Sequence, residues 1–207
     1  AVDLIVANVG PEQLLLNDGT GHFSDGSGGL PPSPGIFLDI TSHVHFADVN
    51  DDECPDLLVS NENPFDPRPD HGAQNWVWIN QTAKKKNHRH GRGYRCTGVF
   101  VDETAARIPL LTDQTAAMLA GDIDGDGDLD LVVLDRGQEH VLVNDGTGHF
   151  TDDTVARFPV TTDSTRSGVL AVLCRGGPLD LLPSPTRNSP HLNYCHDGRG
   201  FFSAGQF

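Results

Sequence analysis

The stretch "GDIDGDGDLDLVV", residues 121–133, carries five aspartates at alternate positions and then turns apolar. Like charges this close together repel one another, so the segment either surrounds a cation or is a solvated acidic turn. Calcium takes about six to eight oxygen ligands, mostly carboxylates and carbonyls, and a short acidic loop supplies both. Magnesium is the weaker candidate, because it needs a strict octahedron and keeps several waters. The stretch therefore predicts a Ca²⁺-binding loop.

The loop assigns a role to each aspartate. Side chains at its first, third and fifth positions can point inward together, and the seventh position normally offers its carbonyl. An EF-hand would close with glutamate at the twelfth position, which is Val133 here, so this loop closes earlier, at its ninth residue. Gly125 and Gly127 supply backbone conformations that other residues resist. The predicted ligands are the carboxylates of Asp122, Asp124, Asp126 and Asp130 and the carbonyl of Asp128.

The chain repeats itself around this loop. The heptapeptide "NDGTGHF" occurs at 144–150 and again at 17–23, and in both copies an Asp-Leu pair starts 14 residues before the asparagine. A third copy contains "FADVNDDECPDLLVS" at 46–60, and a decayed fourth copy contains "AVLCRGGPLDLL" at 171–182. The anchor aspartates of the four copies recur at intervals of 53, 74 and 50 residues, and they are Asp3, Asp56, Asp130 and Asp180.

Each copy predicts four short strands. One apolar run leads into the acidic loop, a second leaves it, a third ends at an Asp-Gly turn and a fourth begins after that turn. Such strands form an antiparallel sheet, and four-stranded units at this period indicate β-propeller blades. The predicted fold is all-β, with about four blades in a single propeller segment over 1–207. The repeats span approximately 1–38, 39–112, 113–165 and 166–207.

The ring of blades is expected to be incomplete. The first copy begins inside its loop, and a propeller needs about four to eight blades to close. We therefore expect a fragment of a longer protein, or an assembly in which the rest of the propeller or other copies close the ring. An open ring would expose the faces and edges of its end sheets.

The acidic loops of the copies are unequal. The second keeps a ligand set of the same kind, but Glu53 replaces a glycine and strains the turn, which predicts weaker Ca²⁺ binding. In the fourth, Val172, Cys174 and Gly176 stand at the first three ligand positions, which predicts no binding. The predicted ligands of the second loop are Asp48, Asn50, Asp52, Asp56 and the carbonyl of Cys54.

The acidic loop, the "DLVV" strand and the "NDGTGHF" turn together resemble the FG-GAP/VCBS repeat. That repeat builds the β-propeller of integrin α-subunit heads and of many bacterial secreted or surface proteins. The literal Phe-Gly and Gly-Ala-Pro signatures are absent, so the integrin-like extreme of the family is disfavoured. The resemblance implies a calcium-dependent, extracellular or cell-surface propeller that serves adhesion or scaffolding.

Composition limits the class of partner. The chain has 207 residues and a formal net charge of −15, which opposes nucleic-acid binding because phosphate contacts need a basic face. No apolar run reaches the roughly 18 residues of a membrane span. The four cysteines form no CxxC pair, so a zinc knuckle is disfavoured. Two disulfides in any pairing, or four free thiols, both remain open.

Two insertions interrupt the second repeat, at 61–75 and at 81–95. The latter, "QTAKKKNHRHGRGYR", is basic and replaces the third turn. It is either a site for anionic glycans or acidic partners or a solvated, mobile hairpin, and we favour the hairpin. Trp76 and Trp78 fall on the third strand, where packing within the blade is the default.

These features predict a binding module rather than an enzyme. The sequence shows no Ser/His/Asp order, phosphate loop or HExxH motif, and the calcium loops account for its paired acids. The expected ligand is an unidentified protein or glycan. Two alternatives remain: an enzyme acting on polysaccharide from a propeller scaffold, and a structural spacer in a large surface protein.

Overall fold

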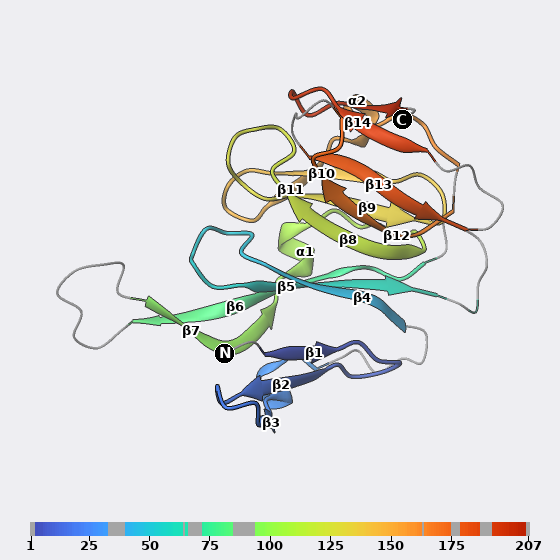
Figure 1. Cartoon of the computed structure of the whole chain (residues 1–207). Coiled ribbons are helices and arrows are strands. Elements are labelled where there is room, and N and C mark those ends of the chain that lie inside the picture. The colour runs from blue at the N-terminus through green and yellow to red at the C-terminus, as the bar shows by residue number, and fades with distance from the viewer. Residues whose placement is uncertain are drawn as a thin grey trace.

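Each repeat folds as one antiparallel sheet in the computed structural model, and we call these sheets blades 1 to 4 in chain order (Figure 1). The structure describes residues 3–32, 40–63, 65, 72–84, 94–162, 164–174, 179–186 and 192–205. Within these residues blade 1 has three strands, and blades 2, 3 and 4 have four strands each. The predicted all-β fold of antiparallel propeller blades is confirmed.

The strands of each sheet are neighbours in chain order. Blade 1 contains β1 (Leu4–Val6), β2 (Gln13–Asn17) and β3 (Phe23–Asp25). Blade 2 contains β4 (Ile40–Ala47), β5 (Asp56–Glu62), β6 (Trp76–Lys84) and β7 (Tyr94–Asp102). Blade 3 contains β8 (Thr115–Gly121), β9 (Asp130–Asp135), β10 (His140–Asn144) and β11 (Phe150–Asp152). Blade 4 contains β12 (Thr165–Ala171), β13 (Asp180–Pro185), β14 (Asn193–His196) and β15 (Phe202–Gly205).

The strand that follows each acidic loop starts at the anchor aspartate or directly after it, as the repeat predicts; in blade 1 this is its first described strand, β1. Helix is confined to single turns among the described residues: η1 (Ser27–Gly29), α1 (Thr104–Arg107) and α2 (Thr154–Arg157). The two α-turns follow the last strands of blades 2 and 3 and lead into the next blade. No described helix has the length and apolar character needed to span a membrane.

The hydrophobic core lies between successive blades rather than inside any one of them. Leu57 and Trp78 belong to the cluster between blades 1 and 2, Leu58 and Leu131 to that between blades 2 and 3, and Val132 to that between blades 3 and 4. Alternate residues of one strand therefore serve opposite layers, as the pleat of a strand requires. Every residue of β9 is buried for this reason.

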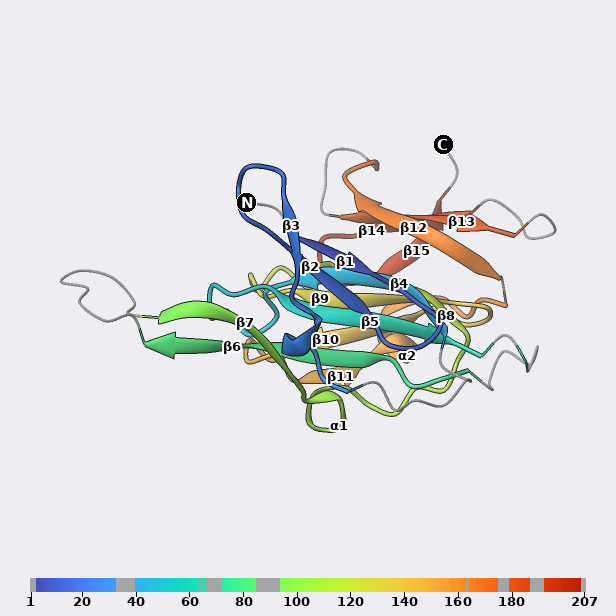
Figure 2. The same cartoon turned by 90° about the horizontal axis from the view of Figure 1, so that it is seen from below.

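The outer blades lack such cover on one side. Blades 1 and 4 lie at opposite ends of the stack, and the chain termini lie with them (Figure 1, and Figure 2 from below). Leu4 and Phe23 of blade 1 and Val169 of blade 4 stay more than two-fifths exposed. Exposed apolar side chains on the end sheets are the property expected of an open row of blades.

Two disulfides, Cys54–Cys96 in blade 2 and Cys174–Cys195 in blade 4, decide the question of free thiols that the sequence left open. Trp76 and Trp78 stack with ring centroids 5.4 Å apart and are both buried, which confirms their packing role.

The basic insertion at 81–95 is shorter than predicted. The β6–β7 ladder continues through the pairs Thr82–Cys96, Ala83–Arg95 and Lys84–Tyr94, so both ends of the stretch are strand. The ladder resumes after an irregularity between Asn80 and Thr82, and the Thr97 hydroxyl donates to the Gln81 carbonyl across it at 2.7 Å. The predictions for residues 85–93, which include Lys85, Lys86, Arg89 and Arg92, fall outside the described part of the chain.

Candidate metal centre in the acidic loops

All four anchor aspartates act as clamps on the backbone. In blade 3, Asp130 accepts the N–H groups of Ile123 (2.8 Å) and Asp124 (3.3 Å) through Oδ2 and that of Asn144 (2.8 Å) through Oδ1. One carboxylate thereby fixes the acidic loop and the end of the third strand at once. Buried carboxylates are stable only when hydrogen-bonded or paired, and this arrangement meets that need.

The same clamp recurs in the other blades. Asp56 accepts the N–H groups of Val49 (3.2 Å) and Asn80 (2.9 Å). Asp3 accepts that of Asn17 at 2.8 Å. Asp180 accepts those of Leu173 (2.7 Å), Cys174 (2.6 Å) and His196 (2.8 Å). The clamp is present even in blade 4, whose loop lacks the other acidic residues. The primary role of the anchor aspartate is therefore structural.

The acidic loop of blade 3, residues 122–130, gathers three of the predicted ligands. Asp122, Asp124 and Asp130 each offer a carboxylate oxygen, and these atoms lie within 4.8 Å of one another. Asp124 Oδ1 is buried and has no hydrogen-bond partner, although such atoms normally have one. An oxygen cluster with one buried, unsatisfied member fits a hard cation such as Ca²⁺.

The two remaining predicted ligands of this loop lie at its rim. Asp126 is exposed and accepts the N–H of Asp128 at 3.0 Å, and it is not one of the three clustered carboxylates. Gly125 (φ 84°) and Gly127 (φ 99°) adopt the left-handed backbone expected for them. Ligation by the Asp126 carboxylate and the Asp128 carbonyl remains a prediction.

The electrostatics of the loop favour a bound cation. Burial raises the pKa of Asp130 to about 6, despite the opposing hydrogen bonds. Desolvation also raises the pKa of Asp128, with a further contribution from the carboxylates of Asp126, Asp51 and Asp122. A divalent cation stabilises ionised carboxylates and would lower both values.

The acidic loop of blade 2, residues 48–56, is built differently. Asp48 already accepts the N–H groups of Asp52 (3.1 Å) and Glu53 (2.8 Å). Asn50 Oδ1, at the position of Asp124, is likewise buried without a hydrogen-bond partner. Asp51 (φ 54°) and Glu53 (φ 67°) both hold the left-handed conformation that glycines hold in blade 3. The strain predicted at Glu53 is present, and the second strained residue, Asp51, was not predicted.

The charge and closure of this second loop also differ from those of blade 3. Burial raises the pKa of Asp56 to about 7. Cys54, whose carbonyl was the predicted ligand, has its side chain in the disulfide to Cys96. Among the described residues, only the blade 3 loop has three carboxylates grouped within a metal's reach.

Two arginines, one in α1 and one in α2, join neighbouring blades beside the acidic loops. Arg107 donates to the Thr147 carbonyl in the third turn of blade 3 at 2.7 Å. Arg157 lies 3.4 Å from Asp124 Oδ2 and places its guanidinium 5.9 Å from the Phe201 ring centroid in blade 4. Sequence reasoning missed this pair, although "TAAR" and "TVAR" occupy matching positions in two repeats.

The comparisons with known proteins agree with this geometry. Residues 122–172 match the family model described as the FG-GAP-like repeat. These residues form an FG-GAP-like repeat. It begins at the first predicted ligand of the blade 3 loop and ends just after β12, the first strand of blade 4.

A similar solved structure is that of a lectin of Agrocybe aegerita, which was reported for its specific recognition of non-reducing terminal N-acetylglucosamine. The match has a TM-score of 0.54 at 17% identity and covers 97% of this chain. This chain spans 47% of that chain, about half its length. At this identity the likeness establishes the propeller fold alone. No curated protein matches the sequence.

One pocket lies on the outer part of blade 2, next to α1. It has a volume of about 430 Å³. Trp76, Gln74 and Asp102 combine an aromatic edge with polar groups in its wall, and Leu110 stands exposed at its margin. Pockets with a few convergent polar groups on an apolar lining are the usual form of small-ligand sites.

Proposed function

We propose that this FG-GAP-like chain is a Ca²⁺-stabilised propeller module that binds a glycan or protein ligand outside the cell. The proposal rests chiefly on the carboxylate cluster of Asp122, Asp124 and Asp130, whose oxygens lie within 4.8 Å of one another. The unsatisfied Asp124 Oδ1 supports it, since a bound cation would complete that atom's coordination.

The extracellular location is supported by the two disulfides, because such bonds persist mainly in oxidising compartments. Millimolar extracellular calcium would fill even a modest site of this kind, whereas cytosolic levels would leave it largely empty. In this setting the cation holds the β8–β9 hairpin and offsets the repulsion among its aspartates.

Calcium titration of the full chain tests the first half of the proposal. We expect calorimetry to show saturable Ca²⁺ binding and the melting temperature to rise with added Ca²⁺. Asp124→Asn, which keeps the shape and removes the charge, should abolish most of both responses. Asp145→Asn, a matched change in the exposed third turn of the same blade, should leave them intact. Equal responses in the two variants would refute the metal centre.

For the ligand, we propose a glycan bound in the pocket of blade 2. The fold likeness to a lectin supports a sugar as the ligand. In the pocket, Trp76 would make the apolar contact with the sugar, and Asp102 would accept hydrogen bonds from the sugar hydroxyls. In this proposal the module binds its glycan without transforming it.

A glycan panel that includes terminal N-acetylglucosamine tests this second half. Binding by the native chain should fall at least about tenfold in Asp102→Asn, as expected when a polar contact in a site is lost. If no glycan binds while the Ca²⁺ response is normal, the glycan is excluded and the metal centre stands. A screen in which only proteins bind would favour the protein ligand.

A further inference from the structure

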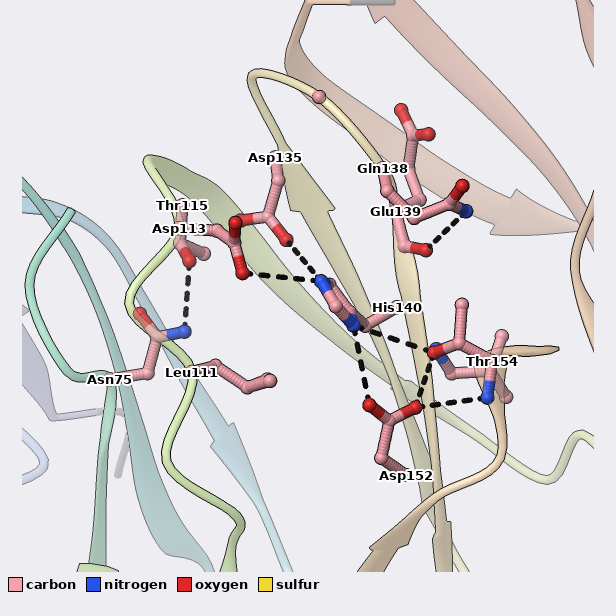
Figure 3. A network of polar contacts seen from close by, with 12 residues as sticks. Asn75, Leu111, Asp113, Thr115, Asp135, Gln138, Glu139, His140, Asp152 and Thr154 are labelled. Atoms are coloured by element: carbon pink, nitrogen blue, oxygen red, sulfur yellow. Dashed lines mark hydrogen bonds and ion pairs between the residues drawn. The ribbon is translucent and has the colours of Figure 1, made fainter. Parts of the chain in front are cut away.

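A second cluster of metal-binding side chains lies at the opposite end of blade 3 from the acidic loop. Asp113 precedes β8, Asp135 ends β9, His140 begins β10 and Asp152 ends β11 (Figure 3). His140 Nε2 lies 3.3 Å from Asp113 Oδ2 and 3.8 Å from Asp135 Oδ2. The three ligand atoms on this side of the imidazole ring lie within 4.8 Å of one another.

Asp135 is the member of this cluster that the protein leaves unsatisfied. It is 1% exposed, and neither carboxylate oxygen has a partner within 3.5 Å among the described residues, although the Thr115 side chain lies near enough to stabilise its charge. Its carboxylate points toward the His140 ring (Figure 3). A buried carboxylate without hydrogen bonds is costly, and such groups are stable when paired or bound to a metal.

The other side of the imidazole ring is already supported. Asp152 Oδ2 lies 3.6 Å from His140 Nδ1, and Asp152 Oδ1 accepts the Thr154 hydroxyl (Figure 3). The same hydroxyl oxygen accepts the N–H of Val141 at 3.0 Å, which fixes Thr154 in turn. A metal-binding histidine almost always directs its second nitrogen to a carboxylate or carbonyl, and that partner selects the tautomer with Nε2 free to ligate.

Charge and spacing define the class of ion. Three carboxylates surround one imidazole, so the cluster stays negative even when His140 is protonated. Ligands of a tetrahedral Zn²⁺ at its usual bond lengths lie roughly 3.3–3.6 Å apart, close to the two separations at Nε2. Imidazole with carboxylates suits Zn²⁺ and its neighbours, whereas Ca²⁺ prefers oxygen alone. We propose that Asp113, Asp135 and His140 bind a divalent transition metal of the Zn²⁺ class, with Asp152 orienting the histidine.

Blade 2 provides an internal control for this proposal. Strand register makes Asn61 the counterpart of Asp135, since they pair with Thr41 and Thr115, and Trp76 the counterpart of His140. The Asn61 side chain donates to the Gln74 carbonyl at 2.9 Å, and its Oδ1 lies 3.2 Å from the Thr41 hydroxyl, which also donates to Glu12. The neutral amide has a direct partner in the Gln74 carbonyl, whereas the carboxylate of blade 3 has none within 3.5 Å among the described residues. The unsatisfied acid therefore accompanies the histidine and is not a requirement of the blade.

A zinc titration of the full chain in saturating Ca²⁺ tests the proposal. Calorimetry should detect binding that Asp135→Asn and His140→Gln each weaken at least about tenfold. Asp152→Asn should weaken it by about 10–100-fold, as loss of an orienting partner does. His22→Ala, which removes an exposed histidine of blade 1, should leave binding unchanged. Co²⁺ should give the visible absorption of a tetrahedral site in the native chain and lose it in Asp135→Asn.

The outcomes separate a metal site from a simple ion pair. If the native chain takes up no zinc, or if Asp135→Asn and His140→Gln bind as the native chain does, the site is refuted and the cluster is an internal ion pair. Near-ultraviolet circular dichroism checks that each variant is folded. Should His140→Gln fail to fold, Asp135→Asn decides alone, because the amide it introduces is already accommodated at Asn61 in blade 2.

Discussion

The acidic loops of blades 3 and 4 end on the same clamp but are secured in different ways. The blade 3 loop has the clustered carboxylates of Asp122, Asp124 and Asp130 and no disulfide. The blade 4 loop has a disulfide from Cys174, at the position of Asp124, and keeps Asp180 as its anchor. The anchor therefore belongs to the fold, whereas the covalent bond and the carboxylate cluster are alternative means of closing the loop.

The pKa values of the two anchors, Asp130 in blade 3 and Asp180 in blade 4, also differ. Burial raises the pKa of Asp130 to about 6. For Asp180, burial also acts to raise the pKa, but the N–H groups of Cys174, His196 and Leu173 outweigh it and the net pKa is lowered. The hydrogen bonds within blade 4 therefore suffice to stabilise the ionised form of Asp180, whereas those of blade 3 do not offset the burial of Asp130. Blade 2 combines a partial ligand set with a disulfide, and burial raises the pKa of its anchor Asp56 to about 7.

The largest effects should follow removal of an anchor. Asp130→Ala and Asp180→Ala each leave three backbone N–H groups without their acceptor. Unsatisfied buried donors cost about 1–3 kcal/mol each, so we expect a loss of about 3–5 kcal/mol in the free energy of unfolding. Urea denaturation measures this loss. Asp130→Ala should also lose the Ca²⁺ response, and Asp180→Ala should keep it; the reverse pattern would overturn the comparison.

Loss of the blade 4 disulfide should have the next largest effect. The Cys174→Ala/Cys195→Ala double variant opens a link between residues 21 apart, which predicts a destabilisation of about 3 kcal/mol. Added Ca²⁺ should restore none of it, since the blade 4 loop lacks the ligands. Thermal melts with and without Ca²⁺ provide the measurement. A full rescue by Ca²⁺ would mean that blade 4 has a cation site after all.

Removal of calcium from the native chain should be somewhat milder. Stabilisation by a ligand follows mass action and amounts to about 2.7 kcal/mol when free Ca²⁺ is 100 times its dissociation constant. Chelator should therefore lower the melting temperature, and Ca²⁺ should restore it. Asp126→Ala should remove most of this response if its carboxylate ligates, whereas Asp128→Ala should remove little. Identical behaviour of the two variants would contradict the assignment of carboxylate and carbonyl roles.

The smallest expected effect concerns the strained loop of blade 2. Glu53→Gly relieves a left-handed residue and should stabilise the chain by about 0.5–1 kcal/mol. The reciprocal change, Gly127→Glu in blade 3, should destabilise it by a similar amount. Urea midpoints at saturating Ca²⁺ compare the two. A neutral result for both would show that this turn carries no strain in either blade.

The repeat could be predicted from the sequence because its signals are local. The anchor aspartates mark where the strand after each acidic loop begins, and the glycines at 125 and 127 mark left-handed positions. Both depend on residues adjacent in the chain. The clustering of Asp122, Asp124 and Asp130 follows from the same short spacing.

Features that depend on strand register could not be predicted in this way. Asp113, Asp135, His140 and Asp152 have no common spacing, and only the pairing of four chain segments brings them together. The disulfide partners were similarly undetermined, because several pairings satisfy the composition. The strand ends at 81–84 and 94–95 were missed because charge dominated the interpretation of that insertion.

The anchor clamp determines how the repeat can lengthen without losing its shape. The bond from the anchor to the third strand spans 14 residues in blade 3, where Asn144 ends β10, and 24 residues in blade 2, where Asn80 lies within β6. Because the clamp fixes one residue of the third strand relative to the anchor, extra residues between the second and third strands move neither its register nor its side-chain alternation. The β5–β6 connection is therefore a position at which the blade tolerates grafted sequence, and new surface can be added there while the hydrophobic layers stay aligned.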